Sequence, residues 1–379
     1  MGEDGQNVII INGNPYAFEP GETILEVARR HDIDIPTLCH LKGAPPTGAC
    51  RVCVVEVEGA ASLMASCATP AGSGMAVHTE TPKVVAARRQ VLDLMLASGN
   101  HNCTIRQPDE ADWTAQQLKV MQEDQAEELC PVWGDCRLQE LAFRYQVTAK
   151  RYDPAKTLYP QELANPFIVR DFSRCIRCGR CIQACNEVQV NNAINFGFRG
   201  AALKIVAAGD RPLRNSDCVF CGECVQACPV GALVEKDTRY RVRPWETTRT
   251  RTTCSYCGVG CQLDLHVADG RVVRVTGAED VAPNYGSLCV KGRFGYDFIH
   301  SPERLTTPLV RDGNHLREAT WDEALDRVAT GFKAIRERDG ADAIGVLCSA
   351  RITNEENYLL NKLARAALGT NNIDHCARL

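Results

Sequence analysis

Two short stretches of this sequence repeat one cysteine spacing, C-x2-C-x2-C-x3-C, which is typical of metal–sulfur chemistry. Their cysteines are Cys175, Cys178, Cys181 and Cys185, followed by Cys218, Cys221, Cys224 and Cys228. In loops of this kind three thiolates hold one [4Fe–4S] cluster, and the fourth reaches the cluster of the other loop. We therefore expect Cys228 to complete the first cluster and Cys185 to complete the second. Two zinc sites are the alternative, but zinc usually joins two C-x2-C pairs across a longer gap.

The cysteine count of the whole chain supports metal ligation. There are 21 cysteines in 379 residues. Disulfides would explain such a count in a small secreted protein, but this chain is large and shows no export signal. We therefore expect a cytoplasmic protein whose thiols hold clusters that pass single electrons. Cys348 and Cys376 fall outside every motif, and we interpret them as ordinary thiols.

Composition excludes several other classes of function. The apolar and charged fractions, 45% and 24%, are those of an ordinary globular protein. The net charge of −4 gives no reason to expect a nucleic-acid partner. No apolar run approaches the ~18 residues that a membrane span needs.

A second cysteine set lies in the first 80 residues, with the spacing C-x10-C-x2-C-x13-C. It consists of Cys39, Cys50, Cys53 and Cys67. Strands are predicted at 8–11 and 16–18 around the turn Asn12-Gly13, and the capping box Thr23-x-x-Glu26 predicts a helix to Arg30. The spacing resembles the [2Fe–2S] ferredoxin domain of complex I-like and hydrogenase-like subunits, with a longer first gap than the plant type.

A third set resembles the His-plus-three-Cys [4Fe–4S] site of the same subunits. Its members are His101, Cys103, Cys130 and Cys136. The match is looser here, because 26 residues separate the first two cysteines, and a surface histidine is the alternative for His101. A helix is predicted at 83–98, and another within the acidic insert 109–129.

A fourth set resembles the [4Fe–4S] subdomain that opens the molybdopterin-dependent oxidoreductases. It consists of Cys254, Cys257, Cys261 and Cys289, with a predicted hairpin of strands 262–267 and 271–276 around Asp269-Gly270. In that family the lysine of the motif Cys289-Val-Lys-Gly relays electrons between cluster and pterin, so the resemblance implies this role for Lys291. A solvated surface lysine is the alternative.

The segments that flank this set carry weaker signals. Five arginines between 239 and 251 indicate a linker or interdomain contact, with a basic partner patch as the alternative. Further on, Thr320-x-x-Glu323 predicts a helix to about Arg338, and the apolar run 343–348 predicts a buried parallel strand. Asn354 is expected to cap a helix that ends at Gly369.

Residues 349–357 and 369–378 resemble the catalytic subunit of formate dehydrogenases, and with the four cysteine sets the resemblance covers nearly the whole chain. It implies the N-terminal part of the alpha subunit of a cytoplasmic NAD(P)-linked formate dehydrogenase. The implied cofactors are one [2Fe–2S] cluster, four [4Fe–4S] clusters and a bis-molybdopterin guanine dinucleotide with molybdenum or tungsten. Arg351 would help to hold a pterin. The implied partners are a flavin-bearing NAD(P)-reducing subunit and a small iron–sulfur subunit, with formate as substrate.

The fold class expected from these signals is an α+β multidomain iron–sulfur protein. Its predicted parts are a β-grasp [2Fe–2S] ferredoxin (1–80), a His-plus-three-Cys domain (81–150), a bacterial-type double [4Fe–4S] ferredoxin (165–240), a [4Fe–4S] subdomain (250–305) and the incomplete α/β start of a pterin domain (306–379). Three alternatives share parts of this order: a complex I-like large subunit, an iron-only hydrogenase, and a non-catalytic electron carrier. Residues 252–379 lack the hydrogenase active-site motifs, and the stretch Asn371-Asn-Ile-Asp argues against complex I.

The sequence carries no candidate catalytic residue of its own. In the formate dehydrogenases the stretch matching 371–379 is followed by the metal-ligating cysteine or selenocysteine. The resemblance therefore predicts that ligand just after Leu379, and a selenocysteine codon read as a stop would explain the chain end. A deliberately shortened chain is the alternative.

Overall fold

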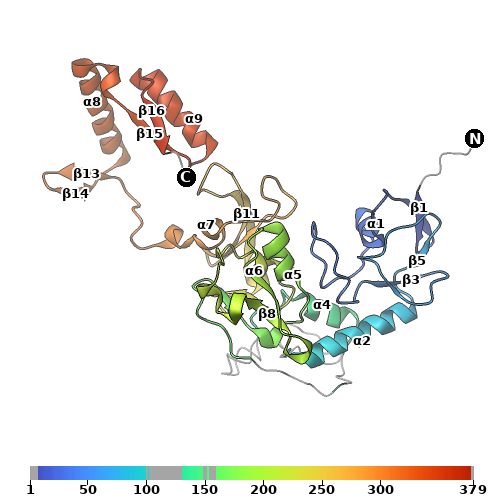
Figure 1. Ribbon diagram of the computed structural model, residues 1–379. Coiled ribbons are helices and arrows are strands. Elements are labelled where there is room, and N and C mark those ends of the chain that lie inside the picture. Colours follow the sequence, from blue (N-terminus) through green and yellow to red (C-terminus); the bar gives the residue numbers. More distant parts are fainter. Residues whose placement is uncertain (1–6, 100, 102–129, 148–151, 153–158, 377–379) are drawn as a thin grey trace, which may run out of the picture. The chain divides into compact units, whose positions relative to one another are not determined.

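The computed structural model describes residues 7–99, 101, 130–147, 152 and 159–376. It divides the chain into two compact units, Met1–Thr247 and Thr248–Leu379. Both units combine short helices with small sheets (Figure 1). None of the helices in the described ranges has both the length and the hydrophobicity that a membrane crossing requires.

The first unit opens with a five-stranded sheet of order β2-β1-β5-β3-β4. Its strands are β1 (Val8–Ile11), β2 (Asn14–Ala17), β3 (Val54–Val57), β4 (Met64–Ala65) and β5 (Ala76–His78). β1 pairs antiparallel with β2 and parallel with β5, which is the mixed arrangement of a β-grasp sheet. Helix α1 (Ile24–Arg30) begins at the predicted capping box, where Thr23 and Glu26 each bond the other's backbone.

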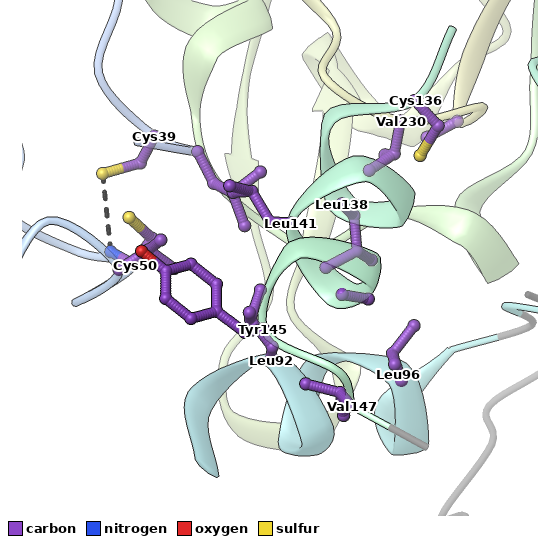
Figure 2. Close-up of a cluster of buried hydrophobic side chains, with 14 residues drawn as sticks. Cys39, Cys50, Leu92, Leu96, Cys136, Leu138, Leu141, Tyr145, Val147 and Val230 are labelled. Atoms are coloured by element: carbon purple, nitrogen blue, oxygen red, sulfur yellow. Dashed lines mark hydrogen bonds between the residues drawn. The ribbon is translucent and has the colours of Figure 1, made fainter. Parts of the chain in front are cut away.

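Two helices, α2 (Pro82–Ser98) and α4 (Arg137–Arg144), follow the sheet. The predicted signals hold for α2, because Thr81 caps its start and Gly99 ends it. Leu92 and Leu96 of α2 share one hydrophobic core with Leu138 and Leu141 of α4 (Figure 2). The helix predicted within 109–129 lies outside the described residues.

Cysteine side chains from three of the predicted cluster sites belong to this same core. They are Cys39, Cys50 and Cys136, with Cys175, Cys178 and Cys228 packed against its edge. We call this whole hydrophobic core, with its leucines and its cysteines, the shared core. It means that the three cysteine loops are held by one body of packed side chains.

The double-cysteine segment folds as two similar halves between paired outer strands. Its elements are β6 (Ile168–Arg170), α5 (Arg180–Gln183), β7 (Ile194–Gly197), β8 (Lys204–Ala207), α6 (Glu223–Ala227) and β9 (Leu233–Glu235). β6 pairs with β9, and β7 and β8 form the hairpin between the halves. Gly179 and Gly222, which precede α5 and α6, adopt left-handed φ angles of 79° and 75°. A side chain is strained in that conformation, so glycine lets each cysteine loop turn into its helix.

The second unit begins with a three-stranded sheet of order β10-β11-β12. Its strands are β10 (Thr248–Thr253), β11 (Gln262–Ala268) and β12 (Arg271–Gly277). The predicted hairpin is present, and Asp269 and Gly270 both have positive φ at its turn. The linker prediction is wrong for residues 248–253, because this polar segment is an edge strand in which Arg251 pairs with Asp264 of β11.

The remainder of the second unit contains a helix-and-strand segment. Its elements are α7 (Val290–Phe294), β13 (Leu309–Asp312), β14 (His315–Glu318), α8 (Trp321–Asp339), β15 (Val346–Ser349), α9 (Asn354–Lys362) and β16 (Ile373–Cys376). Thr320 caps α8 as predicted.

Three details of this segment correct the predictions. Thr353, not Asn354, caps α9, because the Thr353 hydroxyl accepts from the Glu356 amide in a capping box. The short strand β16 was missed, and it pairs in parallel with β15. β15 itself was expected to be buried, yet Leu347 is 84% exposed. A two-stranded sheet has too few neighbours to bury both of its faces.

Candidate iron–sulfur sites

The four cysteines of the first 80 residues lie together and are all buried. Cys39 and Cys50 lie between α1 and β3, Cys53 directly precedes β3, and Cys67 follows β4. The Cys50 amide donates to Cys39 Sγ at 3.4 Å (Figure 2). The Cys50 thiol lowers the pKa of Cys39 to about 5, and Cys67 lowers the pKa of Cys53 to about 6. The same contacts raise the pKa of Cys50 and of Cys67, so one cysteine of each pair, Cys39 or Cys53, favours the thiolate, which is the form that ligates iron.

In the double-cysteine segment, the structure brings the fourth cysteine of each half to the other half. Burial is the main cause that raises the pKa of Cys175 to about 11 and that of Cys178 to about 12, and the nearby Cys228 thiol contributes to both shifts. A cavity is lined by Cys175, Cys178, Cys181 and Cys228, with Cys224 and apolar side chains around them. The arrangement matches the predicted first ligand set and offers a water-poor space for a cluster.

The second half shows the reciprocal arrangement. Burial raises the pKa of Cys224, and Cys221, Cys218 and Cys185 act in the same direction. Cys185 also raises the pKa of Cys218. The Ala193 amide donates to Cys185 Sγ at 3.4 Å, so this sulfur is held in place by the backbone.

Single-ion sites have a different geometry. A zinc ion needs its sulfurs within about 2.3 Å of one point, whereas a cubane binds each thiolate at a separate iron. Within the described ranges, no group of three or more His, Cys, Asp or Glu side chains could hold a single metal ion.

The predicted His-plus-three-Cys site is described in part. Cys130 and Cys136 are buried at the two ends of a turn, and Cys136 precedes the first residue of α4. Arg243 Nη1 donates to the Cys130 carbonyl at 2.9 Å, so this arginine is buried in the first unit and does not belong to a linker. His101 is buried against Gly99, where an added Cβ would lie 2.7 Å from His101 Nε2. Burial argues against the surface-turn alternative; Cys103 lies outside the described residues, and the ligand role of His101 stays a prediction.

The fourth set also converges. Burial raises the pKa of Cys254 and of Cys261, and the Cys257 and Cys289 thiols raise both further. The Cys254 amide donates to the Cys261 carbonyl at 2.8 Å, which closes the loop on itself. Gly292 lies against Cys254, where an added Cβ would be 3.5 Å from Sγ.

The two residues assigned by resemblance are both exposed. Lys291 lies in α7, two residues after Cys289. Arg351 follows the carboxyl end of β15, and its amide donates to Ser349 Oγ at 3.0 Å. In open parallel sheets, ligands bind beyond the carboxyl ends of strands. The position of Arg351 therefore suits a ligand contact, and both roles stay predictions.

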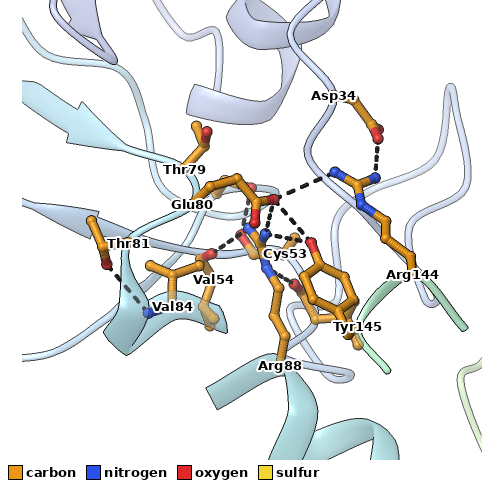
Figure 3. A network of polar contacts seen from close by, with 12 residues as sticks. Asp34, Cys53, Val54, Thr79, Glu80, Thr81, Val84, Arg88, Arg144 and Tyr145 are labelled. Atoms are coloured by element: carbon orange, nitrogen blue, oxygen red, sulfur yellow. Dashed lines mark hydrogen bonds and ion pairs between the residues drawn. The ribbon is translucent and has the colours of Figure 1, made fainter. Parts of the chain in front are cut away.

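Sequence reasoning missed Arg88, a fully buried arginine beside the first cysteine set. Its guanidinium donates to the carbonyls of Val52 and Val54, on either side of Cys53 (Figure 3). A sequence signal existed, because positions 84, 88, 92 and 96 fall on one face of α2 and the other three are apolar.

Together the fold and these sites define an iron–sulfur electron-transfer protein joined to the opening of a pterin-binding oxidoreductase domain. Four families match the chain in this order: "2Fe-2S iron-sulfur cluster binding domain" at 8–82, "4Fe-4S dicluster domain" at 174–232, "Molybdopterin oxidoreductase Fe4S4 domain" at 247–301 and "Molybdopterin oxidoreductase" at 304–379. The chain therefore carries iron–sulfur domains followed by the opening of a molybdopterin oxidoreductase domain, as these family models describe them. The predicted α+β multidomain fold class is confirmed.

Three relatives carry the names of redox enzymes or of their subunits. The chain is 38% identical over 371 residues to the NADPH-Fe(3+) oxidoreductase subunit alpha of Geobacter sulfurreducens (strain DL-1 / KN400), covering 98% of this chain and 40% of the relative. It is 35% identical over 376 residues to a subunit of an NADH-quinone oxidoreductase from Rhizobium meliloti (strain 1021), again covering 98% and 40%. A Staphylococcus aureus (strain USA300) protein named "Putative formate dehydrogenase" is 30% identical over 409 residues, with 98% and 39% covered. The chain thus spans about 40% of the length of these relatives.

A solved structure shares part of the fold. A chain of an NAD+-reducing [NiFe]-hydrogenase in the H2-reduced state superposes with a TM-score of 0.52 at 30% identity. The match covers 62% of this chain and 90% of the hydrogenase chain.

Proposed function

We propose that this chain is the electron-transfer and pterin-proximal part of an NAD(P)-linked formate dehydrogenase. The observation that carries the proposal is the order of the cysteine sites along the chain, which ends in a pterin-domain opening. Formate as substrate is supported by the resemblance of residues 349–357 and 369–378, and by the name of the Staphylococcus relative.

In this proposal the cysteine sets hold one [2Fe–2S] and four [4Fe–4S] clusters. The proposed ligands are Cys39, Cys50, Cys53 and Cys67; His101, Cys103, Cys130 and Cys136; Cys175, Cys178, Cys181 and Cys228; Cys185, Cys218, Cys221 and Cys224; and Cys254, Cys257, Cys261 and Cys289. A bis-pterin molybdenum or tungsten centre supplies the two-electron oxidation of formate to carbon dioxide when it is bound. Lys291 and Arg351 are the proposed contacts of this chain with the pterins.

The protein's own contribution is to exclude water and fix the thiolates. The apolar lining of the Cys175 cavity lowers the local dielectric, and backbone amides hold Cys39 and Cys185 at their sulfurs. A rigid, dry ligand shell limits reorganisation when an electron arrives or leaves. The proposed partners are a flavin-bearing NAD(P)-reducing subunit and a small iron–sulfur subunit, in the cytoplasm.

The direct test uses the full-length protein with its flavin partner, purified without oxygen. We expect formate to reduce NAD+ or NADP+, and the 379-residue chain alone to reduce no dye with formate. Formate-dependent dye reduction by the 379-residue chain alone would contradict the proposal that this chain transfers electrons and that formate is oxidised only by the complete enzyme. No formate oxidation by the complete, metal-loaded enzyme would contradict the substrate.

A second candidate is an NADPH-oxidising electron-transfer complex. The observation that favours it is the Geobacter relative, which at 38% identity resembles the chain more than the Staphylococcus protein does at 30%. NADPH-dependent reduction of ferric citrate by the complete enzyme, with no response to formate, would select this candidate.

A further inference from the structure

The side chain of Arg88 is fully buried in the first unit, although arginine is among the residues least often buried. It projects from α2 toward β3 and Cys53, the residue that directly precedes this strand (Figure 3). Its Nε donates to the Val52 carbonyl at 3.0 Å, and its Nη2 donates to the Val54 carbonyl at 2.8 Å. Two peptide groups, one on each side of Cys53, are therefore fixed by one guanidinium.

The peptide group of Cys53 itself is fixed by another residue. The Cys53 carbonyl accepts from the Ser66 hydroxyl at 2.8 Å and from the Ser66 amide at 3.2 Å. β5 pairs with β3 at Glu56 and Val57, and at Val52 and Val54 the carbonyls bond Arg88 instead. Arg88 thus continues the hydrogen bonding of the sheet across the cysteine position.

The rest of the guanidinium binds a polar network. Arg88 Nη1 donates to Glu80 Oε1 at 2.6 Å and to the Tyr145 hydroxyl at 2.7 Å, and that hydroxyl donates to Glu80 Oε1 at 2.9 Å. Arg144 also bonds Glu80, at 3.4 Å, and pairs with Asp34. Arg88 is enclosed by this network, whereas Glu80 remains 42% exposed. Water screens the carboxylate more than the guanidinium, so a positive potential remains on the cysteine side.

We propose that Arg88 is a positioning residue for the [2Fe–2S] site that also raises the reduction potential of its cluster. The proposal rests on the ligand set Cys39, Cys50, Cys53 and Cys67. Reduction adds one negative charge to a cluster, so a buried cation one peptide group from a ligand stabilises the reduced form. Net charge and hydrogen bonding around the sulfurs are the ways in which a protein sets cluster potentials.

The test compares four variants of the anaerobically loaded 379-residue chain. The [2Fe–2S] midpoint potential is read by redox titration of its EPR signal, at temperatures where [4Fe–4S] signals are broadened. Arg88→Met removes both the charge and the paired hydrogen bonds to the Val52 and Val54 carbonyls. We therefore expect a more negative midpoint potential and a loss of cluster content. Arg88→Lys keeps the charge but cannot make both of these hydrogen bonds, so we expect a smaller negative shift of the midpoint potential.

Glu80→Gln tests whether the midpoint potential shifts in the opposite direction when a negative charge is removed. It removes the counter-charge and keeps an acceptor for Arg88, so we expect a shift to a more positive midpoint. Lys83→Met is the matched control, because Lys83 lies on the same helix and its side chain is 56% exposed beside Glu56. We expect the wild-type midpoint in that variant.

The outcomes separate this inference from the proposed ligand set. A wild-type chain without a [2Fe–2S] signal contradicts the ligand set. A wild-type signal with the same midpoint and content in Arg88→Met overturns the role of Arg88. If Arg88→Met loses its cluster entirely, the positioning role stands, and the Arg88→Lys and Glu80→Gln midpoints decide the electrostatic role. The electrostatic role is overturned if the midpoint potential of Glu80→Gln is unchanged or more negative than that of the wild type. It is also overturned if Lys83→Met shifts the midpoint as much as Arg88→Met does.

Discussion

At the scale of single residues, the most informative cysteines are the two that cross between halves of the double-cysteine segment. Cys228 lies among the thiols of the Cys175 loop, and Cys185 lies among those of the Cys218 loop. The spacing alone predicted this exchange, because it belongs to a loop type with fixed ligand geometry. Arg88 was not predicted: its position on the apolar face of α2 was a signal of burial, but no motif marks an arginine that bonds to backbone carbonyls and a polar network.

Double variants test the exchange of ligands. Cys185→Ser with Cys218→Ser removes two thiolates from one cluster, so we expect a loss of about four irons per chain. Cys175→Ser with Cys185→Ser damages both clusters, so we expect a loss of about eight irons. Iron and labile-sulfide analysis after anaerobic loading measures both. The opposite pattern would mean that each loop keeps its own fourth cysteine.

Arg251 and Asp264 give a pH-dependent prediction in the second unit. Arg251 Nε donates to Asp264 Oδ1 at 2.9 Å across the β10–β11 pair, and this bond lowers the pKa of the Asp264 carboxyl. A carboxyl with a lowered folded-state pKa adds stability above its unfolded pKa of about 3.9 and loses it below. We expect Asp264→Asn to lower the Tm at pH 7, with the gap to wild type narrowing as the pH falls below 4. A gap that is constant with pH would exclude this ionic contribution.

At the scale of elements, helices with caps were the most predictable part of the fold. α1 and α8 begin directly after the predicted capping threonines, and α2 begins one residue before the predicted start, because side-chain caps are local and visible in sequence. The error at α9 was one residue, since both Thr353 and Asn354 are good caps and the partner Glu356 selects Thr353. β10 and β16 were missed, because they are defined by their pairing partners and lack an apolar pattern.

Helix α4 carries a testable share of the packing energy. Leu141 is fully buried in the shared core, and truncating such a leucine costs ~2–5 kcal/mol. We expect Leu141→Ala to lower the Tm of the transition in which the first unit unfolds by about 5–15 °C. Glu140→Ala, on the exposed side of the same helix, should change it by no more than about 2 °C. Equal effects of the two substitutions would contradict the packing of α4.

At the scale of the whole molecule, the chain forms two compact units, and the predicted cluster sites fall in both. The boundary between the units falls within the arginine-rich segment that is predicted to be a linker or interdomain contact, although the residues on either side of it are folded into the units. The arginine-rich segment was read as one stretch, but Arg243 is buried in the first unit and Arg251 lies on a strand of the second. Polar composition alone does not distinguish a linker from an edge strand, because an edge strand has one side open to water.

The proposed ligand sets predict the metal content of the complete chain. One [2Fe–2S] and four [4Fe–4S] clusters amount to about 18 irons per chain, with an equal number of labile sulfides. Chemical iron and sulfide analysis of anaerobically loaded protein measures this. A strong zinc signal with little iron would contradict the iron–sulfur assignment as a whole.

The shared core has a consequence for how the protein matures and how oxygen damages it. Cysteines from three loops are packed against the same leucines, so an empty site leaves a hole in the support of its neighbours. We therefore expect the insertion of clusters to be cooperative, so that individual chains contain either all of these clusters or almost none. Exposure to air should act in the same way in reverse. Once the first cluster is lost, its neighbours in the same body should follow quickly, so that damage spreads from site to site.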